Sequence, residues 1–147
     1  MREQKSYYAT PSDTEQQWFI VDAKDQILGR TAAFVASILR GKHNPKFTPS
    51  MDTGEFVVIC NAEKIKVTGN KLKEKKYYTH SRYPGGLKEI SLEHLLEKKP
   101  EHALYKAIEG MLPKNRLGRK LLTKVKIYAG GSHDHEAQNP KPLSVPK

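Results

Sequence analysis

Two short apolar runs separated by one amphipathic helix constrain the fold of this chain more than any other feature. Residues 18–21 and 56–60 are unbroken apolar runs rich in β-branched and aromatic residues, a pattern typical of strands buried on both faces. The helix expected between them covers 29–40, with alanine, valine, isoleucine and leucine on its buried side. Gly41 follows where a glycine cap ends many helices. Two strands joined through a helix form a βαβ unit, whose strands are parallel and whose crossover is right-handed.

The rest of the chain adds helices and one short strand. Residues 42–52 are polar and contain two prolines, which predicts a loop. Ser91 is the expected N-cap of a helix over 92–98, and a second helix over 100–111 has its proline in the first turn. Apolar residues alternate with a lysine over 125–128, which predicts the last strand.

Both ends of the chain are poor in large apolar residues. Residues 130–147 also contain three prolines. Neither end can bury enough surface on its own to offset the entropy lost on ordering it. We therefore expect one α/β domain over 18–129, an N-terminal extension over 1–17 and a C-terminal tail over 130–147, with both ends flexible in the free protein.

Composition excludes several classes of protein. The chain is 37% hydrophobic with a mean hydropathy of −0.70, which indicates a modest core under a large charged surface. No run approaches the roughly 18 apolar residues of a membrane span, and the first residues lack the apolar stretch of a signal peptide. Cys60 is the one cysteine, so an internal disulfide and a cysteine-cluster zinc site are both excluded. We expect a soluble intracellular protein.

Positive charge is concentrated in one segment. The formal net charge is +10, and residues 114–126 contain six cations and no carboxylate. Asn115 is the expected N-cap of a short helix whose leucines form a single apolar stripe. A helix that docks through one stripe and is otherwise cationic indicates a polyanionic partner, whereas an ordinary solvated surface mixes both signs of charge. The six cations are Lys114, Arg116, Arg119, Lys120, Lys124 and Lys126.

A second basic segment is interleaved with aromatic residues. Lysines attract phosphate, and tyrosine, histidine and arginine planes can stack on unpaired bases. The alternative is an edge strand protected by lysines, with one tyrosine facing the core and the next one exposed. The segment contains Lys71, Lys73, Lys75, Lys76, Tyr77, Tyr78, His80, Arg82 and Tyr83.

Three other features could carry chemistry, and each has a simpler explanation. Asp22 and residues 61–63 follow the two buried strands, where parallel sheets bind ligands, but capping of turns explains them equally well. Gly29 and Arg30 open a helix that could hold a phosphate, yet a lone glycine is no phosphate-binding loop. The adjacent residues of 133–135, His-Asp-His, cannot all aim at one ion from a regular element. We therefore expect no catalytic group, metal or cofactor.

Several of these segments resemble one known family. The run 109–119, EGMLPKNRLGR, looks like the signature of bacterial large-subunit ribosomal protein thirteen. The resemblance extends in the same order from Trp18 to Pro140. Further matching segments are 22–30, 56–64, 68–71, 77–86 and 133–140. Asp134 stands where the family usually has proline, Thr31 replaces a more usual leucine, and nothing carries over to residues 1–17.

The resemblance implies a three-layer α/β/α fold around a mainly parallel four-stranded sheet, as a single domain with extended termini. It also implies a cytoplasmic, non-enzymatic protein of the large ribosomal subunit. Such a protein would bind large-subunit ribosomal RNA early in assembly, beside neighbouring ribosomal proteins, with no membrane or small-molecule substrate. A dissociable regulator such as a translational repressor remains an alternative. The residues expected to bind RNA are Arg30, Lys42, Lys46, Lys71, Lys73, Lys75, Lys76, His80, Arg82, Lys114, Asn115, Arg116, Arg119, Lys120, Lys124 and Lys126.

Overall fold

A four-stranded parallel sheet forms the centre of the molecule. The computed structural model describes residues 7–146, and within them the strand order is β5-β2-β1-β6, with each neighbouring pair parallel. The predicted α/β fold on a mainly parallel four-stranded sheet is thereby confirmed. The strands are β1 (Trp18–Asp22), β2 (Phe56–Cys60), β5 (Val125–Ile127) and β6 (Lys141–Pro142).

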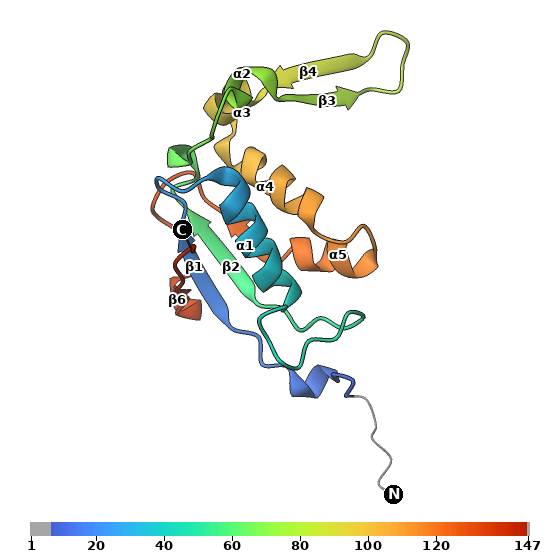
Figure 1. Cartoon of the computed structure of the whole chain (residues 1–147), viewed down its shortest axis with the longest axis vertical. Helices are drawn as coiled ribbons and strands as arrows, with labels where there is room; N and C mark the ends of the chain where they lie inside the picture. The colour runs from blue at the N-terminus through green and yellow to red at the C-terminus, as the bar shows by residue number, and fades with distance from the viewer. Residues whose placement is uncertain (1–6, 147) are drawn as a thin grey trace, which may run out of the picture.

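Helices cover one face of this sheet (Figure 1). Side chains of α1 and α4 form the main core with alternate residues of the strands, among them Val35, Leu39, Ile59 and Leu104. Because successive strand residues point to opposite faces, Phe19, Val57 and Ile127 join the same core. The helices are α1 (Leu28–Arg40), α2 (Lys71–Glu74), α3 (Leu92–Lys98), α4 (Pro100–Met111) and α5 (Arg116–Leu122).

The expected helix caps are present. Gly41 ends α1 in the left-handed conformation, with φ of 80°, and its N–H donates to carbonyls of the last turn. Ser91 Oγ accepts the N–H of His94 at the start of α3. A Cβ on Gly41 would also lie 2.4 Å from the carbonyl oxygen of Thr53. This position therefore needs glycine both for its φ and for the close approach of the following loop.

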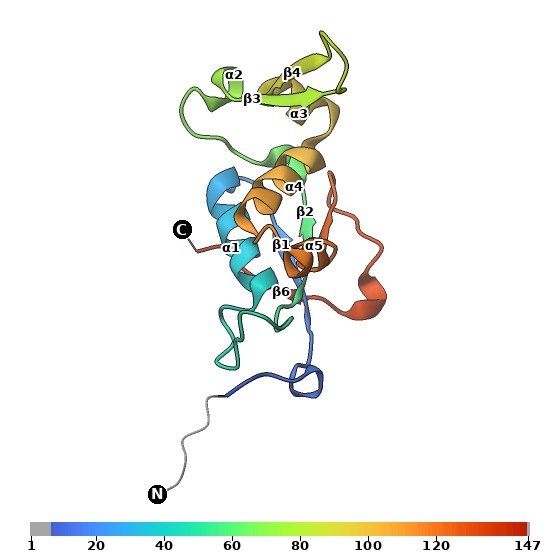
Figure 2. The same ribbon diagram turned by 90° about the vertical axis from the view of Figure 1, so that its right-hand side faces the viewer.

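The C-terminal segment covers part of the opposite face and forms the third layer. Trp18 and Phe56 stack there with ring centroids 4.5 Å apart, and the His135 ring lies 4.9 Å from Trp18. In Figure 2 the strands lie between α1 and the short 3-10 turn η3 (Glu136–Gln138). Trp18 and Ile20, which face this side, and Phe19, which faces the helices, are all half-buried. The prediction that this strand is buried on both faces is wrong for those three residues.

The segment expected to be a tail also contributes to the sheet and the core. β6 pairs with β1, and the N–H of Leu143 donates to the carbonyl of Ile20 at 2.8 Å. Val145 is 9% exposed and belongs to the main core. The sequence pattern missed this strand because it has two residues, one of them a proline, which only an edge strand tolerates.

Residues 7–17 lie against the loop that precedes β2. Ala9 is buried, and its N–H donates to Thr48 Oγ1 at 3.1 Å. The N–H of Gln17 donates to the buried carboxylate of Glu55, which anchors the chain just before β1. Residues 1–6 of the predicted N-terminal extension lie outside the described residues.

An antiparallel hairpin projects from one end of the molecule (Figure 1). It consists of β3 (Lys76–His80) and β4 (Leu87–Ser91). At its base, Tyr77 pairs with Ile90, and both side chains pack against the main core, while Tyr78 is 60% exposed. This matches the alternative in which one tyrosine faces the core and the next one faces solvent. The strand β4 was not predicted.

No helix within residues 7–146 is long and apolar enough to cross a membrane.

Candidate nucleic-acid interface

The short helix α5 presents cations on a fixed frame. Asn115 Oδ1 accepts the N–H of Gly118 at 2.8 Å, so Asn115 is the N-cap, as predicted. Leu121 and Leu122 are buried on the core side. A Cβ on Gly118 would lie 1.7 Å from the Pro113 carbonyl oxygen, so glycine lets the helix pack directly against the preceding chain. The exposed cations of α5 and of the residues just before it are Lys114, Arg116, Arg119 and Lys120.

Lys124 is not part of this exposed set. It is 4% exposed, and its Nζ contacts Asp52 Oδ1 and donates to the carbonyl of Gly54 at 3.1 Å. Asp52 Oδ2 also lies 3.6 Å from Lys120 Nζ. The sequence count missed this carboxylate because it precedes Lys124 by 72 positions. Lys124 is therefore withdrawn from the predicted RNA-binding residues, since its charge is already paired inside the protein.

Lys126 is exposed but lies on a different face. Its neighbours in β5, Val125 and Ile127, pack into the core beneath the helices. Alternation along the strand points Lys126 to the opposite side of the sheet. The structure thus brings together four of the six cations counted between residues 114 and 126.

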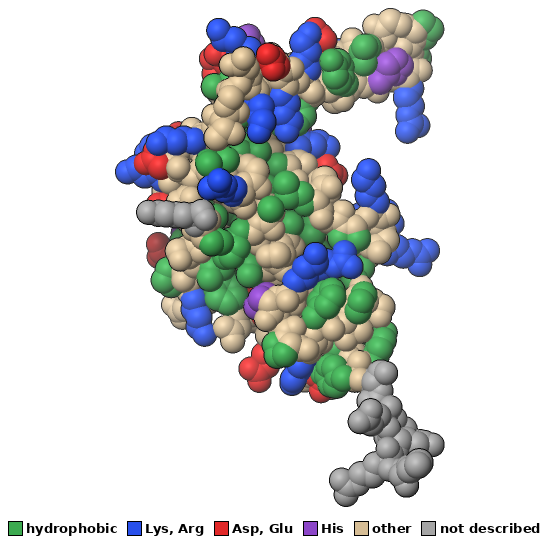
Figure 3. All heavy atoms as spheres, viewed as in Figure 1, with side chains coloured by type: hydrophobic (Ala, Val, Ile, Leu, Met, Phe, Trp, Pro, Cys, Tyr) green, Lys and Arg blue, Asp and Glu red, His purple; other side chains and the backbone are tan. Residues whose placement is uncertain are grey.

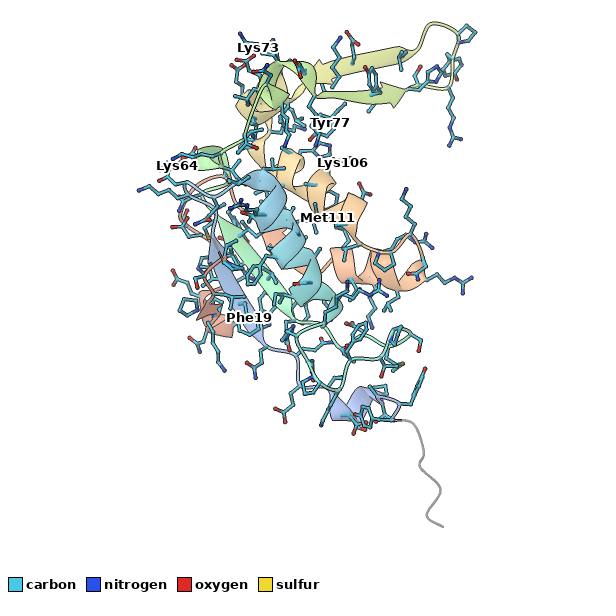
Figure 4. The ribbon with its side chains drawn as sticks, in the orientation of Figure 1. Phe19, Lys64, Lys73, Tyr77, Lys106 and Met111 are labelled. Carbon is cyan, nitrogen blue, oxygen red and sulfur yellow. The ribbon has the colours of Figure 1, made fainter. Side chains whose placement is uncertain are left out.

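A groove at the start of α1 gathers cations from distant parts of the chain. Arg30 from the first turn of α1 lines it together with Lys71 and Lys75, and Glu74 is its one acidic residue. Its volume is about 660 Å³. Lys73 belongs to the same short helix, α2, and extends away from the body in Figure 4. Arg30 therefore lies in the same groove as residues of the second basic segment, although the two are far apart in the sequence.

The hairpin presents aromatic rings and cations to solvent. Tyr83 in its turn is 76% exposed. Lys76 Nζ lies 3.1 Å from Glu89 Oε1, and this hydrogen bond and charge raise the pKa of Lys76. His80 Nδ1 accepts the N–H of Arg82 at 2.8 Å, in a turn where Arg82 has a φ of 68°. His80 and Arg82 are both exposed, so they remain available to a partner.

The loop before β2 carries the last two predicted cations. Lys42 and Lys46 are exposed, and the N–H of Lys46 donates to Asn44 Oδ1 at 2.9 Å. Arg40 lies over the Phe47 ring at 5.9 Å, which ties the loop to the end of α1. Figure 1 shows this loop at the end of the molecule opposite the hairpin. These two lysines therefore form a separate cationic area.

The polar residues after the buried strands hold a turn. Asp22 Oδ1 accepts the N–H of Lys24 at 2.9 Å and the side-chain amide of Asn61 at 2.8 Å. These two hydrogen bonds lower the pKa of Asp22. The Asp22 carboxylate therefore stabilises the turn at this edge of the sheet. This is the capping role that the sequence offered as the alternative to a ligand site.

The His-Asp-His segment packs on aromatic rings. His133 Nδ1 accepts the N–H of His135 at 3.2 Å, and both imidazoles lie near the Tyr128 ring. Within residues 7–146 no group of three or more His, Cys, Asp or Glu side chains is placed to hold an ion. Cys60 is buried, and burial raises the pKa of its thiol. It fills the strand as a small apolar residue.

The model for the family described as ribosomal protein L13 matches residues 16–134, most of the chain. The chain belongs to the ribosomal protein L13 family. It is 59% identical to the large ribosomal subunit protein uL13 of Desulfovibrio desulfuricans, over 97% of this chain and 99% of that protein. It is 55% identical to the uL13 protein of Aquifex aeolicus, over 96% of this chain and 98% of that protein.

The family match confirms the resemblance drawn from the sequence. The matched relatives are ribosomal proteins, so the expectation of a ribosomal protein and not an enzyme is confirmed. Their alignments span nearly the whole chain, whereas the family model ends at residue 134, before β6.

Proposed function

We propose that this protein is a structural constituent of the large ribosomal subunit and binds large-subunit ribosomal RNA through α5, the hairpin and the groove at the start of α1. The observation that carries the proposal is the exposed cationic surface of α5. Three of its four cations, Lys114, Arg116 and Arg119, make no ion pair among the described residues. The uL13 relatives, which are named as proteins of the large ribosomal subunit, support the choice of RNA as the polyanion.

The proposed mechanism is electrostatic and structural. Cations held on a packed frame neutralise phosphates where RNA segments approach one another, and condensed counterions are released. Arg116, Arg119 and Arg82 are suited to paired phosphate oxygens, because a guanidinium presents several donors in one plane. Phosphate contacts fix position and carry little sequence information, so recognition is mainly of RNA shape.

A role early in subunit assembly follows from the same chemistry. Segments of RNA repel one another until their phosphates are neutralised, so a protein that binds where segments converge acts before the RNA is compact. Neighbouring ribosomal proteins would cover surfaces that the RNA leaves open. Both the assembly role and these neighbours are part of the proposal.

Sucrose-gradient fractionation of a cell lysate tests this proposal against a dissociable regulator. A structural constituent should migrate with large subunits in a near one-to-one ratio and stay there after a wash in moderate salt. A protein found mostly in the light fractions, at far below one copy per large subunit, would favour the regulator and contradict the proposal.

A further inference from the structure

The projecting hairpin and the helical body enclose an open notch. The space-filling view in Figure 3 shows the hairpin extending outward above α4 and α5, with Lys and Arg side chains on both sides of the gap. All residues of the hairpin except Tyr77, Gly86, Ile90 and Ser91 are exposed. A two-stranded ribbon is marginally stable in water, so a surface that holds it in place is expected in the functional state.

The register of the hairpin shows which of its faces borders the notch. Residues directly opposite across the strands share a face, so the pairs Tyr77–Ile90 and Thr79–Lys88 lie on the same side. Tyr77 and Ile90 pack against the core. This face therefore points toward the body and places the exposed Lys88 over the notch. The turn adds Arg82, the one cation among residues 81–86.

The opposite wall of the notch is also cationic. In Figure 4 Lys106 extends from α4 on the side of the hairpin. Glu109 lies 2.8 Å from Lys106 Nζ, one turn along α4. Glu109 also lines a hollow with Lys114 and Arg119. The three cations Lys106, Lys114 and Arg119 therefore outnumber Glu109 on this wall. Thr79 lies on the face of the hairpin that points toward them.

We infer that one segment of ribosomal RNA lies in this notch, contacted by Lys88 and Arg82 from above and by Lys106 and Lys114 from below. The inference rests on the proposed function and assigns two contacts, Lys88 and Lys106, that the basic segments of the sequence did not indicate. The charge of the notch decides the class of occupant, because a polyanion can pair with cations on both walls at once. An apolar protein surface would leave Lys88, Arg82 and Lys114 without partners, since of the four only Lys106 is paired within residues 7–146, with Glu109. The cations of the hairpin and the cations of the helical body then contact the same RNA segment.

Directed hydroxyl-radical probing tests the inference. An iron chelate is tethered to a new cysteine, Thr79→Cys on the hairpin or Glu109→Cys on α4, and neither change removes a cation. The buried Cys60 stays unlabelled, which mock labelling of the natural chain checks. Lys64→Cys is the matched control, because Figure 4 places Lys64 on the side of the molecule away from the hairpin. Each labelled protein is bound to large-subunit ribosomal RNA, and the cleaved nucleotides are mapped.

The inference predicts overlapping cleavage from Thr79→Cys and Glu109→Cys, in a stretch that Lys64→Cys does not cut. Two separate stretches, or no RNA cleavage from one of the two notch positions, would overturn the inference while leaving RNA binding intact. Failure of the natural chain to bind the RNA would overturn the proposed function and the inference together.

Charge reversal provides a second readout. Lys88→Glu and Lys106→Glu should each weaken RNA binding about tenfold at 0.1 M salt, because one phosphate contact contributes about 0.9 to the slope of log affinity against log salt. Lys64→Glu should leave the affinity within about twofold. Unchanged affinity in either notch variant, measured beside that control, would contradict the inference.

Discussion

At the scale of single residues, burial decides whether a cation is available to a partner. Lys124 and Arg119 belong to the same basic segment, yet the first is enclosed by Asp52 and Gly54 and the second is exposed. A buried charge must be paired, and removing one partner leaves the other charge uncompensated. Lys124 therefore contributes to the packing of α5 on the loop before β2, and not to RNA binding.

Lys124→Met should lower the free energy of unfolding by about 3 kcal/mol, the scale of a broken buried ion pair. The exposed Lys126→Met in the next strand is the matched control and should change it by less than about 0.5 kcal/mol. Urea denaturation at pH 7 measures both. Equal stability of the two variants would show that the Lys124–Asp52 contact does not stabilise the fold.

Asp22 makes stability depend on pH in a defined direction. Its two hydrogen bonds hold the folded-state pKa below the unfolded value of about 3.9. The contribution to stability is therefore full above that unfolded value and is lost as pH falls through the lower folded value. Asp22→Asn should cost about 0.5–1 kcal/mol at pH 7, the low end for a cap because the carboxylate is exposed, and less at pH 2.5. Denaturation at the two pH values checks this, and an equal loss at both would contradict it.

At the scale of elements, the sequence predicts helices and strands correctly where capping residues and apolar periodicity agree. The helices α1, α3, α4 and α5 were expected from proline, glycine, serine and asparagine at their ends, and the strands β1, β2 and β5 from apolar runs or alternation. The strands β4 and β6 carry no such signal, because the first three of the five residues of β4 are exposed and β6 is two residues long. Only their partners, β3 and β1, define them as strands. Contacts between distant residues, such as Lys124 with Asp52, are likewise absent from any local pattern.

Two helical glycines should respond in opposite ways to alanine. Gly118→Ala would force a Cβ into the Pro113 carbonyl, so we expect a loss of about 2–3 kcal/mol and a displaced α5 that binds RNA more weakly. Gly110→Ala in α4 meets no atom within 4 Å and should stabilise the protein by up to about 1 kcal/mol. Thermal and urea denaturation measure the pair. Equal stabilisation of both variants would show that helix propensity, and not the close approach at Pro113, decides the effect.

At the scale of the whole molecule, the C-terminal segment completes the sheet while the basic groups occupy several faces. The expected boundary at residue 130 does not mark the end of the packed structure, since β6 and Val145 lie beyond it. We therefore revise the expectation of a flexible tail for this part. The N–H of Leu143 should exchange at least about tenfold more slowly than that of the exposed Ser144 in the free protein, because it is bonded to Ile20 in the sheet. Hydrogen exchange followed by NMR measures it, and equal rates would restore the flexible tail.

Under the proposed function, the distribution of cations would let a small protein hold several RNA segments at once. α5, the hairpin and the groove at the start of α1 each gather positive charge, while the loop with Lys42 and Lys46 lies at the far end. The sequence identified most of these residues because runs of basic residues are visible locally. It could not show which of them share a surface, because Arg30 and Lys71 meet only in the folded chain.

The salt dependence of RNA binding tests the central claim most directly. Arg116→Glu with Arg119→Glu is compared with Lys24→Glu plus Lys64→Glu, which makes the same change in net charge at exposed positions outside the proposed interface. Affinity for large-subunit ribosomal RNA is measured for both variants and the natural chain between 0.1 and 0.4 M salt. The account predicts that the arginine variant binds at least about tenfold more weakly at 0.1 M salt and that its salt slope falls by about two, while the control keeps the natural slope. An arginine variant with the affinity and slope of the control would contradict the account.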